Sequence, residues 1–361
     1  MFQYRRLPLT FIMIMLVACS AGVAAPETLD DLLFDQFDDD GPAVVLLVDA
    51  PASVTEIETI GLADIDADQP VRPDDRFRIG SASKTFTATV ILQMVEEGRF
   101  DLDDPISRYV SPVVMGNIEN ADTATIRQLL NMTSGIFDYL GNDDFWFEVE
   151  DNPTHQWTAG EVILYADGEE SYFATGDDWE YSNTNYILLE LLINALGSSY
   201  GQEVENRIAG PLGLTETYVE HYDSRPGGTI HSYESAGGGW NDVRDINDGT
   251  GLADGGIITT AEELGIFISA LVEGDLLSPE MQSEMEDFVI SGGEGYGLGL
   301  STLSTDWGDL YGHDGATAGF ASEMWYHPDE QVTIIVLYGS EDLQESSPDI
   351  IEGALAYVLD R

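Results

Sequence analysis

The sequence predicts an α+β fold in which both ends of the chain contribute strands to one antiparallel sheet. Strand-like segments occur near the N-terminus and again near the C-terminus, whereas the middle, roughly residues 100–255, reads mostly as helix and loop. The last two strand-like segments are separated by Pro328 and Asp329, which predicts a hairpin and therefore antiparallel pairing. We expect flanking helices, an inserted and mostly helical lobe, and a cleft between this lobe and the sheet.

The individual elements follow from short-range patterns. Strands are predicted where β-branched and aromatic residues run between turn residues, namely at 43–48, 54–62, 296–303, 318–327 and 331–338. Helices are predicted from apolar periodicity and terminating residues, at 27–37, 83–97, 125–132, 183–196 and 349–359. The helix at 83–97 is apolar nearly all round before Gly98 ends it, so we expect it to be buried.

The chain is strongly acidic. Sixty-seven acidic residues stand against 13 basic ones among 361, which gives a formal net charge of −54. The acidic residues are interleaved with apolar ones, and the composition is 43% hydrophobic and 10% aromatic, so we expect an acidic surface on a folded core rather than a disordered tail. Such a surface repels nucleic acid and anionic membranes, which excludes both as expected partners, and it indicates a high-salt environment.

The first 18 residues read as an export signal. Arg5 and Arg6 precede an apolar run at 11–17 that is too short to span a bilayer. The run ends at Cys19, the only cysteine, in a Leu-Val-Ala-Cys sequence that resembles a bacterial lipobox. We expect a lipid on Cys19 and a cell-envelope location, with this lipid as the only membrane attachment, residues 19–26 as a tether, and 27–361 as one domain. The alternative is an ordinary signal cleaved after Ala25 and a secreted, soluble protein.

Lys84 is the only lysine in the chain, and it lies three residues after Ser81. Residues at this spacing share one face of a helix, so the amine can reach the serine hydroxyl. A buried lysine can be tuned to accept a proton, which an arginine cannot do. The pair therefore predicts a serine nucleophile with a lysine base. The five histidines form no His-Glu-x-x-His zinc motif, no Gly-x-Ser-x-Gly surrounds the candidate nucleophile Ser81, and we expect no metal or cofactor.

Two further segments complete a pattern. Tyr181-Ser182-Asn183 opens a predicted helix, and His313-Asp314-Gly315 is expected just before a strand. With Ser81-x-x-Lys84 they resemble, in order and spacing, the three motifs of the penicillin-recognising serine hydrolases. The chain is most similar to the group of class C beta-lactamases, D-Ala-D-Ala carboxypeptidases, related esterases and D-aminopeptidases. Neighbouring stretches match as well, at 77–86, 129–135, 181–186, 255–261 and 312–315.

The resemblance implies a beta-lactamase/transpeptidase-like fold, with residues 27–361 as a single catalytic domain. It implies an acyl-enzyme on Ser81, with Lys84 and Tyr181 carrying the proton between nucleophile and leaving group. Which of these two side chains takes the first proton stays open at this point.

The same resemblance assigns the remaining site residues. Asn183 is expected to bind the substrate amide or ester and to hold the lysine, and His313 to polarise the tyrosine oxygen. The backbone N–H groups of Ser81 and Ala316 are expected to form an oxyanion hole, and Gly315 to leave room for substrate.

Asp314 departs from the family pattern. Relatives often carry Thr or Ser there to meet a substrate carboxylate, which an ionised Asp repels unless strand alternation turns it away. The expected function is a D-Ala-D-Ala carboxypeptidase-like peptidase acting on small peptide, amide or ester substrates. The alternatives are an esterase or D-aminopeptidase for neutral or cationic substrates, and a penicillin-binding-like protein that is acylated without turnover.

The acidic composition generates a first prediction. The negative field of the chain favours protonated Lys84 and Tyr181. Salt screens this field, and the screening length falls to roughly 3 Å at about 1 M. We expect the melting temperature, and the turnover of a nitrophenyl ester, to be higher at about 3 M than at about 0.1 M salt. Circular dichroism melts and initial rates measure both, and equal values at the two concentrations contradict the prediction.

Overall fold

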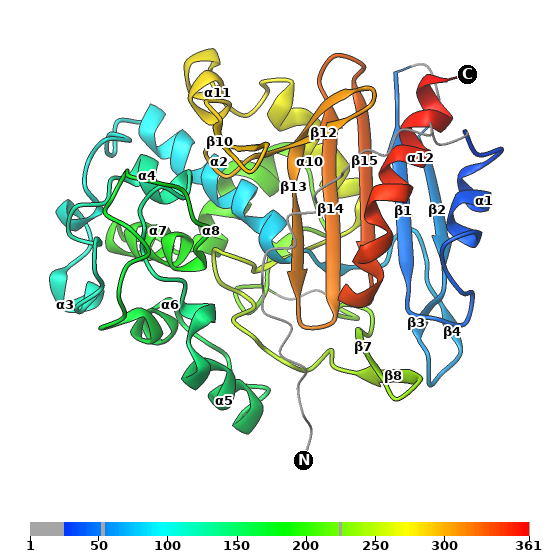
Figure 1. Ribbon diagram of the computed structural model, residues 1–361, viewed down its shortest axis with the longest axis horizontal. Coiled ribbons are helices and arrows are strands. Elements are labelled where there is room, and N and C mark those ends of the chain that lie inside the picture. Colours follow the sequence, from blue (N-terminus) through cyan, green and yellow to red (C-terminus); the bar gives the residue numbers. More distant parts are fainter. Residues whose placement is uncertain (1–24, 52–54, 224–225, 361) are drawn as a thin grey trace.

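The computed structural model describes residues 25–51, 55–223 and 226–360. Its centre is an eight-stranded sheet in which every neighbouring pair is antiparallel, in the order β10-β11-β12-β13-β14-β15-β1-β2. The strands are β1 (Val44–Asp49), β2 (Glu56–Ile60), β10 (Val289–Ser291), β11 (Glu294–Tyr296), β12 (Ser301–Thr305), β13 (Gly308–Thr317), β14 (Phe320–His327) and β15 (Val332–Tyr338). Because β1 pairs with β15, the two chain ends build one sheet, as predicted (Figure 1).

Three small sheets surround the large one. One of them, in the order β5-β9-β6, leads into the helix that follows Ser81. The strands are β3 (Leu62–Asp64) with β4 (Gln69–Pro70), β5 (Phe77–Arg78) with β9 (Ile257–Thr259) and β6 (Tyr218–Val219), and β7 (Tyr233–Ala236) with β8 (Gly239–Asp242).

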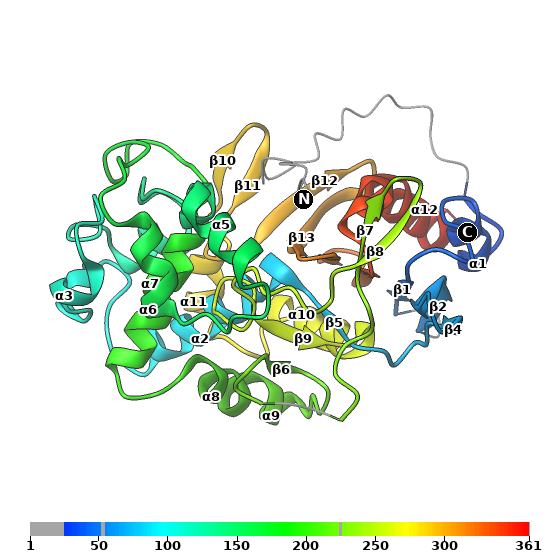
Figure 2. The same ribbon diagram turned by 90° about the horizontal axis from the view of Figure 1, so that it is seen from below.

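Most of the shorter helices belong to the lobe inserted between the strands of the two chain ends. The helices are α1 (Leu29–Phe34), α2 (Ser83–Glu96), α3 (Pro112–Met115), α4 (Ile126–Leu130), α5 (Asp143–Asp151), α6 (Ala159–Val162), α7 (Asn183–Ala195), α8 (Tyr200–Val204), α9 (Gly210–Leu212), α10 (Ala261–Val272), α11 (Pro279–Met285) and α12 (Ser347–Leu359). Figure 2 shows the helices of residues 112–212 gathered away from α1 and α12. Within the described ranges, none of these helices combines the length and apolar character needed to cross a membrane.

Each face of the large sheet has its own apolar core, and alternate residues of β1 enter the two cores. Val45 and Leu47 pack on the face covered by α2 and α10, whereas Val44, Leu46 and Val48 pack on the face covered by α1 and α12 (Figure 1). This period of two is what a strand buried on both faces requires. Helix α2 runs through the larger core and is buried along almost its whole length, as its sequence predicts.

Three strand predictions need correction. The expected strand at 54–62 breaks at Gly61, whose positive φ of 85° brings it so close to Pro42 that a Cβ would lie 2.4 Å from the proline carbonyl oxygen; residue 54 lies outside the described ranges. The expected strand at 296–303 is interrupted at residues 297–300 by a tight turn, so that residue 296 ends β11 and residues 301–303 begin β12. His313-Asp314-Gly315 does not precede a strand but lies inside β13, whose three glycines hide the strand pattern.

The core generates a stability prediction. Phe86 of α2 stacks on Phe267 of α10 with ring centroids 3.6 Å apart, and both side chains are fully buried. We expect Phe86→Ala to lower the free energy of unfolding by about 3–5 kcal/mol, because it removes buried surface and leaves a cavity. Denaturant unfolding at constant high salt measures the loss. Phe34→Ala, at a side chain that is 57% exposed, is the matched control, and equal losses in the two variants contradict the prediction.

Candidate active site

Ser81 lies in a single 3₁₀ turn, η1 (Gly80–Ala82), directly before α2. Gly80 has a positive φ of 50°, and a Cβ there would come within 2.5 Å of the Ala316 carbonyl oxygen. Only glycine combines this backbone conformation with so close an approach to β13. The turn therefore places Ser81 directly beside β13, the strand that contains His313-Asp314-Gly315.

Lys84 is completely buried and makes three hydrogen bonds. Its Nζ lies 3.1 Å from Ser81 Oγ, 2.7 Å from Asn183 Oδ1 and 2.6 Å from the Asp254 carbonyl oxygen. The two shorter contacts are to oxygens that can only accept, whereas the serine hydroxyl can also donate. A neutral amine would therefore keep its two N–H donors on Asn183 and Asp254 and turn its lone pair toward Ser81.

The surroundings of Lys84 make that neutral form accessible. Burial lowers the pKa of Lys84 to about 8, although the nearby carboxyls of Asp254, Asp138 and Asp314 each oppose this shift. Desolvation disfavours the ammonium more strongly than the carboxyls stabilise it.

Asp138 fixes the orientation of the Asn183 amide. One Asp138 oxygen accepts the Asn183 Nδ2–H at 3.0 Å, and the other accepts the Asn183 backbone N–H at 3.2 Å. Since a carboxylate accepts, the amide must point its NH₂ toward Asp138 and its oxygen toward Lys84. Burial raises the pKa of Asp138 to about 6, so at pH 8 this carboxyl is ionised.

Asp254 contacts the site with two different groups. Its backbone oxygen accepts from Lys84, and its buried side chain accepts from the Tyr139 hydroxyl at 2.9 Å. Burial raises the pKa of Asp254 to about 6, and the attraction of Lys84 limits that rise. Asp138 and Asp254 thus place two negative charges close to a single buried amine.

Tyr181 is buried beside the Ser81–Lys84 pair. The Lys84 Nζ lies 5.0 Å from the centre of the tyrosine ring, a cation–π distance, and Ser81 is near enough to the phenol to oppose part of the shift in its pKa. Burial nevertheless raises the pKa of Tyr181 well above its ordinary value. Tyr181 is therefore a neutral phenol, because burial disfavours its ionised form, whereas burial makes the neutral amine of Lys84 accessible.

His313 is fully buried next to Tyr181, with the ring centroids 6.4 Å apart. Its Nδ1 lies 2.5 Å from the Asp314 carbonyl oxygen, and its Nε2 lies 3.1 Å from the Tyr296 hydroxyl. A proton on Nδ1 leaves Nε2 to accept from Tyr296. Burial lowers the pKa of His313 to about 3, so the imidazole is neutral.

Gly315 and Ala316 lie against the nucleophile turn. A Cβ on Gly315 would come 2.1 Å from the Ile79 carbonyl oxygen and 2.8 Å from Ser81 N. The space beside Gly315 is therefore filled by the backbone of residues 79–82, which corrects the expectation that this glycine makes room for substrate. The absence of a side chain on Gly315 lets β13 approach Ser81, and the backbone of the neighbouring Ala316 lies against Gly80 of the nucleophile turn.

Asp314 is turned away from the serine. Its cross-strand partner is Glu323. The next pair along β13, Gly315 with Ser322, faces the nucleophile turn, as the hydrogen bond from Ser322 Oγ to Ile79 O at 2.8 Å shows. Asp314 and Glu323 point to the opposite face, where Gln344 donates to Glu323. Burial and the neighbouring Glu323 raise the pKa of Asp314.

Ser81, Lys84, Tyr181, Asn183 and His313 are thus brought together around one serine, and Gly315 and Ala316 lie beside it. Cys19, the expected lipidation site, lies outside the described residues.

Sequence reasoning missed three side chains: Asp138, Asp254 and Tyr296. Asp138 follows the matched stretch 129–135, and Asp254 precedes the matched stretch 255–261. Position next to these stretches is the signal that could have found both. Tyr296 was assigned only to the start of a strand.

The fold and the family comparison define a serine hydrolase of the beta-lactamase and penicillin-binding protein fold. The family model described as Beta-lactamase matches residues 31–356, and the chain belongs to that family. Penicillin-binding protein 4* of Bacillus subtilis (strain 168) is 28% identical over 317 residues, covering 82% of this chain and 68% of that protein. Protein flp of Staphylococcus aureus (strain N315) is 30% identical over 197 residues, which are 54% of this chain and only 38% of that protein.

Solved structures agree with this family. A D-stereospecific amidohydrolase from Streptomyces sp. superposes with a TM-score of 0.80 at 31% identity, covering 92% of this chain and 98% of that one. D-amino acid amidase from Ochrobactrum anthropi SV3, complexed with L-phenylalanine amide, gives 0.80 at 25% identity and 92% and 97% coverage. The octameric penicillin-binding protein homologue from Pyrococcus abyssi gives 0.77 at 26% identity and 92% and 77% coverage.

The unique lysine makes its protonation directly measurable. With ¹³C-lysine labelling, Lys84 supplies the only lysine Cε signal, and we expect it to titrate near pH 8 rather than near 10.4. Asp138→Asn and Asp254→Asn should each move the midpoint to lower pH, because each removes a negative charge that stabilises the ammonium. The exposed Asp151→Asn is the control and should leave it in place. A midpoint above pH 10 in the wild type contradicts a lysine base.

Proposed function

We propose that the protein is a D-Ala-D-Ala carboxypeptidase-like peptidase that works through an acyl-enzyme on Ser81. The observation that carries this proposal is the environment of Lys84, a buried amine whose other two partners are pure acceptors and whose remaining contact is the Ser81 hydroxyl. Such an amine can take the serine proton as the hydroxyl attacks a carbonyl carbon.

The proposed reaction balances as two acyl transfers. Ser81 Oγ bonds to the substrate carbonyl carbon while its proton passes to Lys84, and the backbone N–H groups of Ser81 and Ala316 stabilise the oxyanion. The C–N bond then breaks, and the leaving amine receives a proton through the Tyr181 phenol, which Lys84 replenishes. Water attacks the resulting ester by the reverse route and releases the acid and free Ser81.

In this mechanism Asn183 binds the substrate amide and holds Lys84, as its contact with that amine supports. Neutral His313 cannot act as a fixed cation, and its proposed role is to orient the phenols around it rather than to attract negative charge.

Two observations favour a peptidase of D-amino acid substrates. The orientation of Asp314 toward Glu323 keeps its carboxyl out of direct contact with a substrate carboxylate beside Ser81. Among the similar structures are a D-stereospecific amidohydrolase and a penicillin-binding protein homologue, which supports the substrate class by analogy.

A D-aminopeptidase or amidase is the second candidate, and an esterase would use the same chemistry. Ionised Asp138 and Asp254 lie near Lys84, and the whole chain is acidic, so a substrate with a free ammonium group is attracted to the site. The name of the similar D-amino acid amidase supports this candidate.

We also propose that the protein is exported and held at the cell envelope by a lipid on Cys19, with a secreted soluble form as the alternative. This proposal rests on the sequence of residues 1–19 alone.

Substrate assays at high salt test the function. Wild type, Ser81→Ala and the control Ser304→Ala, at an exposed serine of β12, are incubated with a D-Ala-D-Ala peptide, a D-amino acid amide, a nitrophenyl ester and a fluorescent penicillin. We expect release of D-Ala by wild type and control, and a loss of at least about a thousandfold in Ser81→Ala.

Turnover of the amide or the ester without release of D-Ala favours the second candidate. Lasting penicillin label without any turnover indicates a penicillin-binding-like protein. Undiminished turnover by Ser81→Ala overturns the acyl-enzyme proposal.

A further inference from the structure

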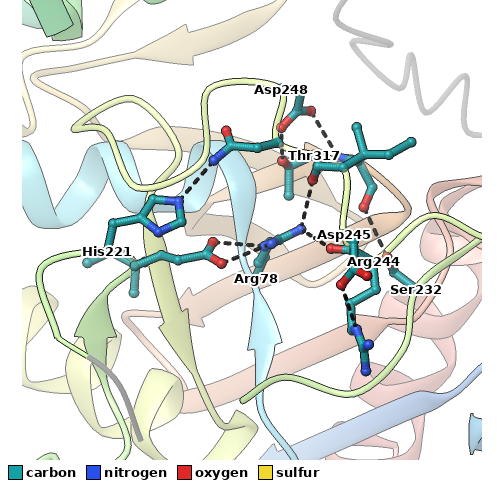
Figure 3. A network of polar contacts seen from close by, with 12 residues as sticks. Arg78, His221, Ser232, Arg244, Asp245, Asp248 and Thr317 are labelled. Carbon is teal, nitrogen blue, oxygen red and sulfur yellow. Dashed lines mark hydrogen bonds and ion pairs between the residues drawn. The ribbon is translucent and has the colours of Figure 1, made fainter. Parts of the chain in front are cut away.

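A buried polar network outside the Ser81–Lys84 site joins the two backbone segments that the proposed mechanism uses as oxyanion donors. It is centred on the loop 244–248, which contacts Arg78 on one side and the end of β13 on the other (Figure 3). We propose that Arg78 and Asp248 are positioning residues that hold the Ser81 and Ala316 N–H groups at a fixed separation. This inference rests on the proposed acyl-enzyme function.

Arg78 fixes the loop to the nucleophile side. It lies on β5, three residues before Ser81, and its side chain is almost fully buried. Its Nε and Nη2 donate to the two oxygens of Glu220 at 2.8 and 2.9 Å, a bidentate pair that orients the guanidinium. Its Nη1 donates to the carbonyl oxygens of Arg244 at 2.9 Å and Ile246 at 3.2 Å.

Asp248 fixes the same loop to β13, the strand that carries Ala316. Its two carboxylate oxygens accept from Thr317 Oγ1 at 2.8 Å and from the Ala318 backbone N–H at 2.9 Å. These two residues follow Ala316 directly, and Thr317 ends β13 while Ala318 begins the turn to β14. Figure 3 shows Asp248 and Arg78 reaching toward Thr317 and the loop from opposite sides.

The turn and the loop are anchored further. Ser232 Oγ donates to the Ala318 carbonyl oxygen at 3.1 Å, so both backbone groups of this turn residue are bonded. The Asn247 N–H donates to Pro153 O at 2.7 Å, and the Trp157 indole donates to Asn247 O at 3.1 Å. The loop is thereby bonded to the helical lobe as well, so a movement of the β13–β14 turn alone cannot carry the loop with it.

The sheet itself does not hold this part of β13 from both sides. The register of β12 with β13 ends at Ser301 opposite Gly312, so in the described part of the chain residues 313–317 pair as a strand with β14 only. The free edge faces the nucleophile turn, where Ala316 meets Gly80. A shift of the β13–β14 turn would therefore move the Ala316 N–H relative to Ser81. The contacts of Asp248 with Thr317 and Ala318 hold this turn in place.

Asp248→Ala tests the proposal because it leaves the Thr317 hydroxyl and the Ala318 N–H without their acceptor. A displacement of about 1 Å in a catalytic group costs on the order of 100-fold in rate, so we expect kcat for the nitrophenyl ester to fall about 10- to 100-fold while KM changes less than about threefold. The affinity for an arylboronic acid, which bonds to Ser81 and places an oxygen at the oxyanion position, should fall in parallel with kcat.

Asp245→Ala is the matched control, since it removes an equal charge from the same loop at a side chain that is 79% exposed. Thr317→Val and Thr317→Ser form a second pair that removes or keeps one hydroxyl, and they serve if Asp248→Ala does not fold. We expect Thr317→Val to lose kcat and boronate affinity, and Thr317→Ser to keep both.

Equal kinetics and equal boronate affinity in Asp248→Ala and Asp245→Ala, or in the two Thr317 variants, overturn the positioning role. A loss of melting temperature with unchanged kcat also overturns it, because that is the signature of a purely structural contact. Both results differ from failure of the proposed function, which shows itself as turnover that survives Ser81→Ala.

Discussion

The burial of one amine is the constraint on which the rest of the site depends. Lys84 lies in the core of a protein with a net charge of −54, and its surroundings must desolvate the ammonium while still providing acceptors for it. The fold meets both demands by bringing an amide oxygen from α7 and a backbone oxygen from the segment before β9 to the same nitrogen. Local burial therefore outweighs the long-range acidic field in setting the lysine pKa.

The acidic residues near the site act through geometry as well as through charge. Asp138 holds the Asn183 amide in the orientation that Lys84 needs, and Asp254 presents its backbone oxygen while its carboxyl is tied to Tyr139. Each contact comes from a different segment of the helical lobe or its connections. The hydrogen bonds of Lys84 thus connect several segments of the fold. A change in the relative position of the lobe and the sheet would alter the distances from the Lys84 amine to its acceptors.

Much of the site could be predicted from the sequence because its residues sit in short motifs on regular elements. Ser81 and Lys84 share one helical turn, and Tyr181 and Asn183 frame the start of α7, so spacing alone brings each pair together. The strand containing His313 was hidden, because the glycines that let β13 approach the serine also erase its strand pattern. The role of Gly315 was predicted wrongly for a different reason: only the packed structure shows that the backbone of residues 79–82 fills the space beside it. Asp138 and Asp254 act across more than 40 residues of chain, and Tyr296 contacts His313 from a different strand 17 residues away, so no local pattern marks these contacts.

The burial of Lys84 also determines how the surface of this protein can be modified. With one lysine in the chain and its side chain wholly enclosed, the ε-amine is shielded from reductive methylation, succinimidyl dyes and amine cross-linkers. The abundant carboxyls are the natural handles instead. Carbodiimide coupling would reach them readily, and each amide formed would remove one of the negative charges that keep the molecules apart in solution.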